Sequence, residues 1–310
     1  MPERGERFPR APRALRPSIA EALAEAVQRL ARSGVAHPRR EATSIWAAVS
    51  GPGVKPGDVW LAREREPAPL VADRFREAVA RRSSGMPFAY AVGRVGFRTL
   101  ELAIDPRALI PRPETEGLVD LVLHGTRHTG KGNGGRGPGG VVADIGTGCG
   151  CIALALAVEG EFDRVIAVER SPEAAALARA NVALVRPQVP VDVREGDLLA
   201  PLAGERCRAI VANPPYLTEA EYLALEPGVR RFEPREALVS GSDGLDATRA
   251  LLADAAALLE PGGMLLVEID ERRGEVVRAL AHEYGWPRAG IHEDLFGRPR
   301  FLLAFPKEAA

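Results

Sequence analysis

The chain of 310 residues has few of the residues on which cross-linked, metal-bound and membrane proteins depend. Its three cysteines, Cys149, Cys151 and Cys207, cannot form a disulfide framework or supply four thiolates for zinc. We therefore expect no metal site and a reducing, cytoplasmic environment. No apolar run approaches the roughly 20 residues of a membrane-spanning helix. Residues 1–16 are rich in arginine and proline, lack the apolar core of a secretion signal and are expected to form a disordered tail.

The chain also lacks a strong net charge, but its two parts differ in sign. Residues 1–100 carry 18 basic and 10 acidic side chains, a net charge of +8, whereas the remainder carries 23 and 32, a net charge of −9. The acidic part argues against direct binding of nucleic acid by the protein as a whole. The basic part leaves two interpretations open, a docking surface for a partner or a solvated arginine-rich face.

The apolar pattern divides the chain into a helical part and an α/β part. Helical spacing predicts a small helical domain over residues 17–86, and period-2 alternation predicts a linking β hairpin over residues 87–106. From residue 107 to 310, alternating strand-like and helix-like segments predict a doubly wound, mostly parallel seven-stranded α/β sheet. The glycine-rich residues 125–140 are expected to be a flexible insertion. They resemble a phosphate-binding loop in sequence, but that motif needs a strand before it and a helix after it, and neither is expected here.

Ligand-binding residues are expected at the carboxyl ends of the parallel strands, where open α/β sheets bind their ligands. The glycines of Gly146–Gly150 allow a tight turn beside a ligand. Glu169 ends the next strand about 20 residues later and is placed to accept hydrogen bonds from ribose hydroxyls. Asp197 follows the third strand, beside an adenine amino group or in an ordinary Asx turn. Asp144 precedes the glycines and suits the cation of S-adenosylmethionine better than a pyrophosphate.

The fourth strand ends in Asn213, Pro214, Pro215 and Tyr216, a sequence suited to a planar nitrogen nucleophile. The Asn213 side-chain oxygen and the Pro214 carbonyl could accept both N–H bonds of an amide or exocyclic amine. These acceptors would direct the nitrogen toward an electrophilic methyl group and stabilise its growing positive charge, while the Tyr216 ring would face the planar group. Two prolines would keep the acceptors fixed.

Three stretches resemble the release factor glutamine methyltransferase family, whose members are class I S-adenosylmethionine-dependent enzymes: LIPRPETEGLVD (109–120), ADIGTGCGCIALALA (143–157) and NPPYL followed by FEPREALVSGSDGLD (232–246). The resemblance implies methylation of N5 of the glutamine in the Gly-Gly-Gln motif of class I peptide chain release factors. From its basic charge, we expect the helical domain to dock this protein substrate. It implies cofactor contacts from Gly146, Thr147, Gly148, Cys149, Gly150, Glu169, Asp197, Leu198 and Asn213. It implies substrate contacts from Asn213, Pro214, Pro215, Tyr216, Phe97, Pro111, Arg112 and Glu114.

The chain departs from the family pattern at four positions, Glu169, Leu198, Asp270 and Arg273. A glutamine methyltransferase of a ribosomal protein shares the Asn-Pro-Pro-Tyr sequence but departs at residues 112–116. A nucleic-acid adenine N6-methyltransferase would need a basic, aromatic target-recognition domain. A binding protein that keeps the fold without catalysis is the third alternative.

Overall fold

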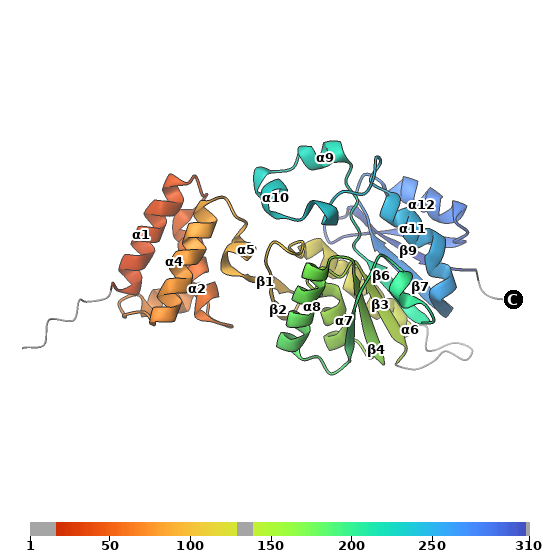
Figure 1. The fold of residues 1–310 in the computed structure, drawn as a ribbon, viewed down its shortest axis with the longest axis horizontal. Helices are drawn as coiled ribbons and strands as arrows, with labels where there is room; N and C mark the ends of the chain where they lie inside the picture. Colours follow the sequence, from red (N-terminus) through yellow and green to blue (C-terminus); the bar gives the residue numbers. More distant parts are fainter. Residues whose placement is uncertain (1–16, 129–138, 308–310) are drawn as a thin grey trace, which may run out of the picture. The chain divides into compact units, whose positions relative to one another are not determined.

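The computed structural model describes residues 17–128 and 139–307. It divides into two compact units, Met1–Val92 and Gly93–Ala310, each with its own hydrophobic core (Figure 1). The expected disordered tail, residues 1–16, lies outside the described residues, and so does most of the expected insertion at 125–140. In the part that is described, no helix is long and apolar enough to cross a membrane.

The first unit consists of five helices, α1 (Ile19–Arg32), α2 (Pro38–Ser50), α3 (Pro56–Ala62), α4 (Pro69–Ser83) and α5 (Phe88–Val92). Ser18 begins α1 with a capping box: its hydroxyl accepts from the Glu21 N–H, and the Glu21 carboxylate accepts from the Ser18 N–H. In the core, the Trp46 and Phe75 rings of α2 and α4 pack with centroids 4.4 Å apart. Helices α3 and α5, of seven and five residues, are too short to show a helical period in the sequence.

The second unit is built on a seven-stranded sheet with strand order β5-β4-β3-β6-β7-β9-β8. Neighbouring strands from β5 to β7 are parallel, and β9 is antiparallel to both β7 and β8, so the predicted mostly parallel sheet is confirmed. The chain runs outward from β3 in one direction to β5 and in the other to β7, which makes the β3/β6 boundary the switch point where ligands bind. The strands are β3 (Val141–Ile145), β4 (Arg164–Glu169), β5 (Val191–Glu195), β6 (Cys207–Ala212), β7 (Leu259–Glu268), β8 (Arg288–Glu293) and β9 (Pro299–Phe305).

Helices pack on both faces of this sheet (Figure 1). The first face carries α6 (Glu116–His128), α7 (Cys151–Glu159) and α8 (Pro172–Val185), and the second carries α11 (Asp246–Asp254) and α12 (Gly274–Glu283). Two short helices, α9 (Glu219–Leu223) and α10 (Pro227–Phe232), follow β6, and the 3-10 turn η1 (Pro113–Thr115) leads into α6.

Two predicted boundaries are wrong. The insertion expected from residue 125 begins later, because α6 continues through His128. Gly125 lies inside this helix, where a Cβ atom would come within 2.7 Å of the Met264 sulfur, so its small size serves close helix–sheet packing. The hairpin expected from residue 87 consists only of β1 (Arg94–Phe97) and β2 (Leu100–Ala103), since residues 88–92 form α5. The hairpin is therefore part of the second unit.

Candidate active site

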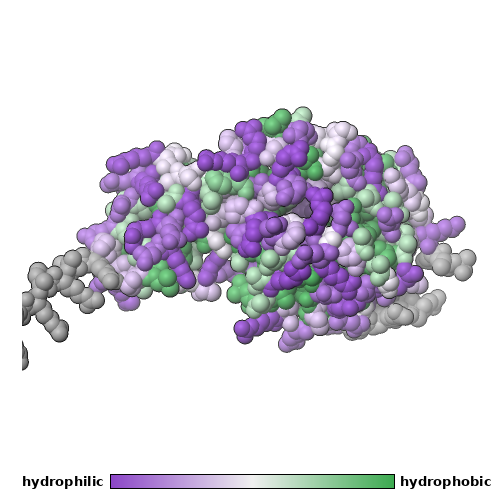
Figure 2. All heavy atoms as spheres, in the orientation of Figure 1, coloured by the Kyte–Doolittle hydropathy of each residue, from purple (hydrophilic) through white to green (hydrophobic). Residues whose placement is uncertain are grey.

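A cavity of about 480 Å³ lies at the carboxyl ends of β3, β4, β5 and β6. The face drawn in Figure 2 is hollowed between α8 and α10, with hydrophilic residues along the rim. The volume is within the usual range for a site that encloses a small organic ligand. Six segments of the second unit contribute to the lining: residues 107–115, 146–152, 169–174, 196–198, 213–215 and 234–247.

The glycine-rich turn after β3 leaves room for a ligand beside the backbone. Gly146 and Gly148 have φ angles of 72° and 56°, which residues with a Cβ rarely adopt. No protein atom outside its chain neighbours lies within 4 Å of a Cβ built on Gly146. Gly150 begins α7 but does not line the cavity, whereas Thr147 and Cys149 do.

Asp144, at the end of β3, is hydrogen-bonded to this turn from the buried side and does not line the cavity. Its fully buried carboxylate accepts from the Thr147 hydroxyl at 2.5 Å and from the Ala153 N–H at 3.1 Å. The second carboxylate oxygen has no hydrogen-bond partner, and burial raises the pKa of Asp144 to about 7. The expectation that Asp144 lies beside a bound cation is therefore replaced by a part in shaping the turn.

Glu169 joins the turn to the next strand and opens onto the cavity. One carboxylate oxygen accepts from the Gly148 N–H and the other from the Ser171 N–H, both at 2.9 Å. Lone pairs remain on both oxygens, since an ionised carboxylate offers about four acceptor positions. A ligand with two adjacent hydroxyl groups could therefore donate to Glu169 without displacing either backbone bond.

The end of β5 contributes an exposed acid and a strained leucine. Asp197 lines the cavity with an exposed side chain, suited to accept from a ligand amino group. Leu198 has a φ of 45°, a conformation that costs a non-glycine residue about 1–2 kcal/mol. Its side chain packs against the core of the second face, which holds the backbone in this conformation beside the cavity.

The Asn-Pro-Pro-Tyr segment leaves β6 at the opposite side of the same cavity. The Asn213 side-chain amide donates to the Thr115 hydroxyl at 3.1 Å, and Pro215 also lines the cavity. Pro214 is buried and Tyr216 is largely buried, and neither is part of the lining. Burial and the neighbouring Glu268 raise the pKa of Tyr216 to about 12. The ring packs in the apolar cluster around Leu217, Tyr222 and Leu238, rather than facing the cavity as expected.

A returning strand-like segment fixes the end of the tetrapeptide. The Tyr216 and Leu217 N–H groups donate to the Leu238 carbonyl at 3.2 and 2.8 Å, and the Ser240 N–H donates to the Leu217 carbonyl at 2.9 Å. Gly244 then passes so close that a Cβ would lie 2.4 Å from the Tyr216 carbonyl oxygen. The sequence motif FEPREALVSGSDGLD thus supports the tetrapeptide directly.

The Arg-Pro-Glu-Thr-Glu motif is tied to the same segment through one buried ion pair. Arg112 donates to the Glu233 carboxylate at 2.7 Å, and the Glu233 side chain is only 1% exposed. Pro111 and Arg112 line the cavity, whereas Glu114 does not. Phe97 is 1% exposed in the core and also lies outside the cavity.

Several lining residues were not among the predicted site residues. Thr115 lies within the Arg-Pro-Glu-Thr-Glu motif, and the lining residues from 234 to 246 lie within the FEPREALVSGSDGLD motif, so the signal was present in stretches already recognised. Arg107 and Ala108, ahead of the first motif, carry no comparable signal.

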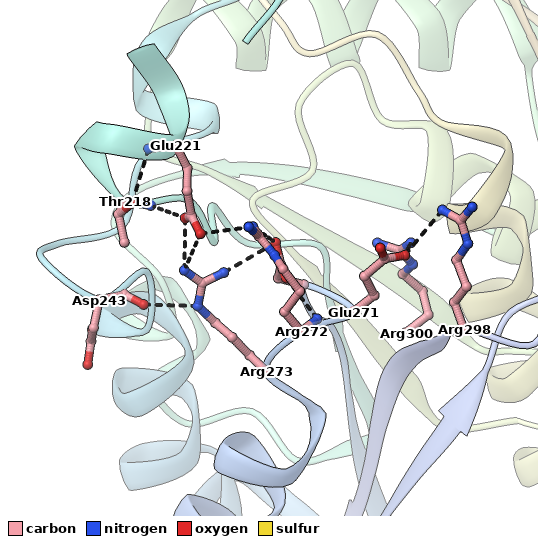
Figure 3. A network of polar contacts seen from close by, with 9 residues as sticks. Thr218, Glu221, Asp243, Glu271, Arg272, Arg273, Arg298 and Arg300 are labelled. Carbon is pink, nitrogen blue, oxygen red and sulfur yellow. Dashed lines mark hydrogen bonds and ion pairs between the residues drawn. The ribbon is translucent and has the colours of Figure 1, made fainter. Parts of the chain in front are cut away.

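The two departures after β7, Asp270 and Arg273, belong to an ion-pair network outside the cavity lining (Figure 3). Arg273 donates to both carboxylate oxygens of Glu221 at 2.9 and 2.8 Å and to the Asp243 carbonyl at 3.0 Å. Asp270 binds Arg272 at 2.7 Å and Arg273 at 3.2 Å. Glu221 also caps α9 by accepting from the Thr218 N–H. Neither Asp270 nor Arg273 lines the cavity, so both act on the segment that follows β6.

The described residues contain no cluster of three histidine, cysteine or acidic side chains that could hold a metal ion. The lining offers instead a paired hydroxyl acceptor, an exposed acid, a glycine turn and an oriented amide. These groups fit an adenosine-containing ligand with a positively charged centre, and they fit a planar nitrogen substrate opposite it.

Known proteins match both units. Two family models fit the chain, the PrmC N-terminal domain over residues 21–93 and the methyltransferase small domain over residues 135–226. A release factor glutamine methyltransferase of Moorella thermoacetica is 40% identical over 296 residues, which cover 94% of this chain and 99% of that protein. The protein of the same name from Deinococcus radiodurans is 38% identical over 288 residues, with coverages of 92% and 98%.

Solved structures of lower identity share the fold. The hMettl16 catalytic domain, solved with a MAT2A 3'UTR hairpin, superimposes with a TM-score of 0.54 at 18% identity and covers 77% of this chain and 82% of its own. A methyltransferase from Pyrococcus furiosus gives a TM-score of 0.50 at 19% identity, with coverages of 73% and 98%. At these identities the likeness concerns the fold alone.

Proposed function

Because the chain belongs to the release factor glutamine methyltransferase family, we propose that it transfers a methyl group from S-adenosyl-L-methionine to a glutamine of its protein substrate. The acceptor is the side-chain amide nitrogen, N5, of the glutamine in the Gly-Gly-Gln motif of class I peptide chain release factors. The observation that carries this proposal is the position of Asn213, which opens onto the same cavity as the glycine turn and Glu169.

The cofactor-binding side of the cavity consists of residues with complementary chemistry. Glu169 would accept from the ribose hydroxyls, Asp197 from the adenine amino group, and the turn at Gly146–Gly148 would pass beside the methionine part. When bound, the cofactor supplies a methyl group on a positively charged sulfur. No phosphate has to be bound, which agrees with the acidic side chains of Glu169 and Asp197 that follow β4 and β5 in the lining.

The substrate side orients a weak nucleophile. An amide nitrogen donates its lone pair to its own carbonyl, so its reactivity depends on how the two N–H bonds are held. The Asn213 amide group donates to Thr115, and its side-chain oxygen is left to accept from the substrate nitrogen. The Pro214 carbonyl would accept the second N–H. Both acceptors stabilise the positive charge that grows on nitrogen, and each is worth about 3–4 kcal/mol by comparison with preorganised donors elsewhere.

The first unit is proposed to dock the release factor. A single glutamine side chain offers too little surface to select one protein among many, so recognition must extend beyond it. Residues 1–92 carry 16 basic and 10 acidic side chains, a net charge of +6, which favours an acidic partner surface.

Mass spectrometry tests the reaction. Incubation of the protein with S-adenosylmethionine and a release factor should increase the mass of the Gly-Gly-Gln peptide by that of one CH₂ group, about 14 mass units, located on the glutamine. Asn213→Ala should abolish this change while cofactor affinity stays within a few fold. Methylation of a ribosomal protein, or of adenine in nucleic acid, with no change in the release factor would overturn the substrate assignment.

A further inference from the structure

Asn213 is the first member of a buried chain of three polar side chains. Its amide nitrogen donates to the Thr115 hydroxyl at 3.1 Å. The Thr115 hydroxyl also acts on the carboxyl group of Glu268, the last residue of β7, because as a donor it lowers the Glu268 pKa that burial raises. Thr115 and Glu268 are each only 1% exposed, so water cannot replace either contact freely.

The direction of each hydrogen bond follows from the groups involved. Burial raises the pKa of Glu268 to about 7, so above that pH its carboxylate is ionised and only accepts, and the Thr115 hydroxyl then donates its one proton to Glu268. The same hydroxyl oxygen is then available only as an acceptor toward Asn213. The Asn213 side chain must therefore present its NH₂ group to Thr115 and its oxygen to the opposite side, where the cavity lies.

Without this chain the amide of Asn213 would have two orientations of similar shape. Rotation by 180° about its last side-chain bond exchanges the oxygen and the NH₂ group with almost no change in volume. In the rotated state an NH₂ group would meet the NH₂ group of a glutamine substrate, and two donors cannot bond. The same state would instead suit a carboxylate.

We propose that Thr115 and Glu268 are positioning residues that fix the orientation of the Asn213 amide and thereby make the site accept glutamine and reject glutamate. The proposal rests on the function proposed above, and it assigns the choice between two nearly isosteric side chains to residues that do not contact the reacting nitrogen. A site built around hydrogen-bond acceptors discriminates strongly, because a wrong ligand leaves buried polar groups unpaired.

One carboxylate oxygen of Glu268 has no hydrogen-bond partner, although the atom is buried. Such a group is costly, which is consistent with a specific use for the charge. The other groups that act on it are Arg300 of β9, Glu114 and Arg112 next to η1, and Tyr216 after β6. None of these replaces Thr115 as the link to Asn213, since among the described residues the hydrogen bond of the Asn213 side chain goes to Thr115.

The test compares two peptides that contain either Gly-Gly-Gln or Gly-Gly-Glu. Their dissociation constants are measured on the full chain with S-adenosylhomocysteine bound, together with kcat for the glutamine peptide. Thr115→Val removes the hydroxyl at nearly constant volume. We expect kcat to fall about 10- to 100-fold, as for a misaligned reacting group, and the preference for glutamine over glutamate to fall at least about 10-fold. Thr115→Ser keeps the hydroxyl and should restore both values to within about 3-fold.

Two further variants separate positioning from folding. Thr126→Val is the matched control, since this buried threonine of α6 bonds a helix carbonyl and does not line the cavity. It should leave the peptide preference unchanged. Glu268→Gln lets the residue accept from Thr115 in only one of two amide orientations, so the preference should fall by less than in Thr115→Val.

The proposal is overturned if folded Thr115→Val, with normal cofactor affinity, keeps the wild-type preference between the peptides, or if Thr115→Ser behaves like Thr115→Val. An unchanged preference in Glu268→Gln would remove Glu268 from the assignment. If the wild-type protein methylates no Gly-Gly-Gln peptide or release factor, the proposed function fails instead, and that outcome is read from the wild type alone.

Discussion

Replacing Glu169 with alanine should weaken the binding of S-adenosylmethionine by about 1.5–3 kcal/mol, the contribution of a hydrogen bond to a charged group. Each carboxylate oxygen of Glu169 already accepts one backbone N–H at 2.9 Å, which leaves acceptor positions for two ribose hydroxyls. Two such bonds could contribute more, but the side chain is half-buried and water replaces part of the loss. The expected rise in Kd is therefore about 10- to 150-fold, at about 1.4 kcal/mol per tenfold.

Calorimetry with two ligands separates a ribose contact from a looser glycine turn. S-adenosylhomocysteine and its analogue without the 2′-hydroxyl are each titrated into wild type and Glu169→Ala. If Glu169 binds the ribose, the analogue should bind the wild type more weakly than S-adenosylhomocysteine does, whereas the two ligands should bind Glu169→Ala with nearly equal affinity, as in a double-mutant cycle. Glu195→Ala is the control, because Glu195 ends the neighbouring strand in register with Glu169 but is exposed and bonded to Arg179.

The reasoning is refuted if the missing hydroxyl costs the same affinity in wild type and in Glu169→Ala. It is also refuted if Glu169→Ala binds the cofactor as tightly as Glu195→Ala does. In either case the carboxylate would serve only to tie the turn to β4 through Gly148.

Three further predictions follow from the two units, the buried acids and the ion-pair network. A chain that starts at Gly93 should keep its cofactor affinity and its rate on a short Gly-Gly-Gln peptide but methylate an intact release factor much more slowly. If the truncated and full-length chains methylate intact release factor at equal rates, docking by the first unit is ruled out. Burial raises the pKa of Asp144 to about 7, above its unfolded value, so its contribution to stability is complete at low pH and is lost as the pH rises through 7. The free energy of unfolding measured in urea should therefore rise for Asp144→Asn relative to wild type between pH 4 and 8, by on the order of 4 kcal/mol. A difference between the two proteins that does not change with pH would contradict the assignment. Arg273→Gln should lower the free energy of unfolding by about 1–3 kcal/mol because it breaks the bonds to Glu221 and Asp243, whereas Arg298→Gln, at a side chain 58% exposed, should change it little.

The fold could be predicted from the sequence because its signals are local and repeated. Alternating strand and helix patterns from Val141 onward predicted the sheet, and the strand ends predicted where Glu169, Asp197 and Asn213 meet. Short helices such as α9 and α10 were not predicted, since five or six residues do not show a period. The end of α6 was misplaced because glycine often terminates helices, whereas Gly125 lies inside α6 at a point where a Cβ atom would come within 2.7 Å of the Met264 sulfur.

Side-chain direction was the harder part of the site. Tyr216 follows the cavity residues in sequence, and its ring was expected to face the substrate, but the side chain packs against the apolar cluster of Leu217, Tyr222 and Leu238 and is not part of the cavity lining. Thr115 contacts Asn213 across 98 positions of sequence, a separation at which no local pattern indicates contact. The two acids with raised pKa values, Asp144 and Glu268, are recognisable only once their burial is known.

The bonds between Leu217 and residues 238–240 have an evolutionary consequence. They join the two ends of a loop by hydrogen bonds, so the twenty residues from 218 to 237 start and finish at one fixed place in the domain. The cost of closing such a loop rises only slowly with its length. Within these residues Glu221 and Glu233 are tied back to Arg273 and Arg112, so new surface side chains could accumulate at the exposed positions between these anchors while the geometry at Asn213 stays constant. The enzyme can in this way change what it touches on a partner without altering where it delivers a methyl group.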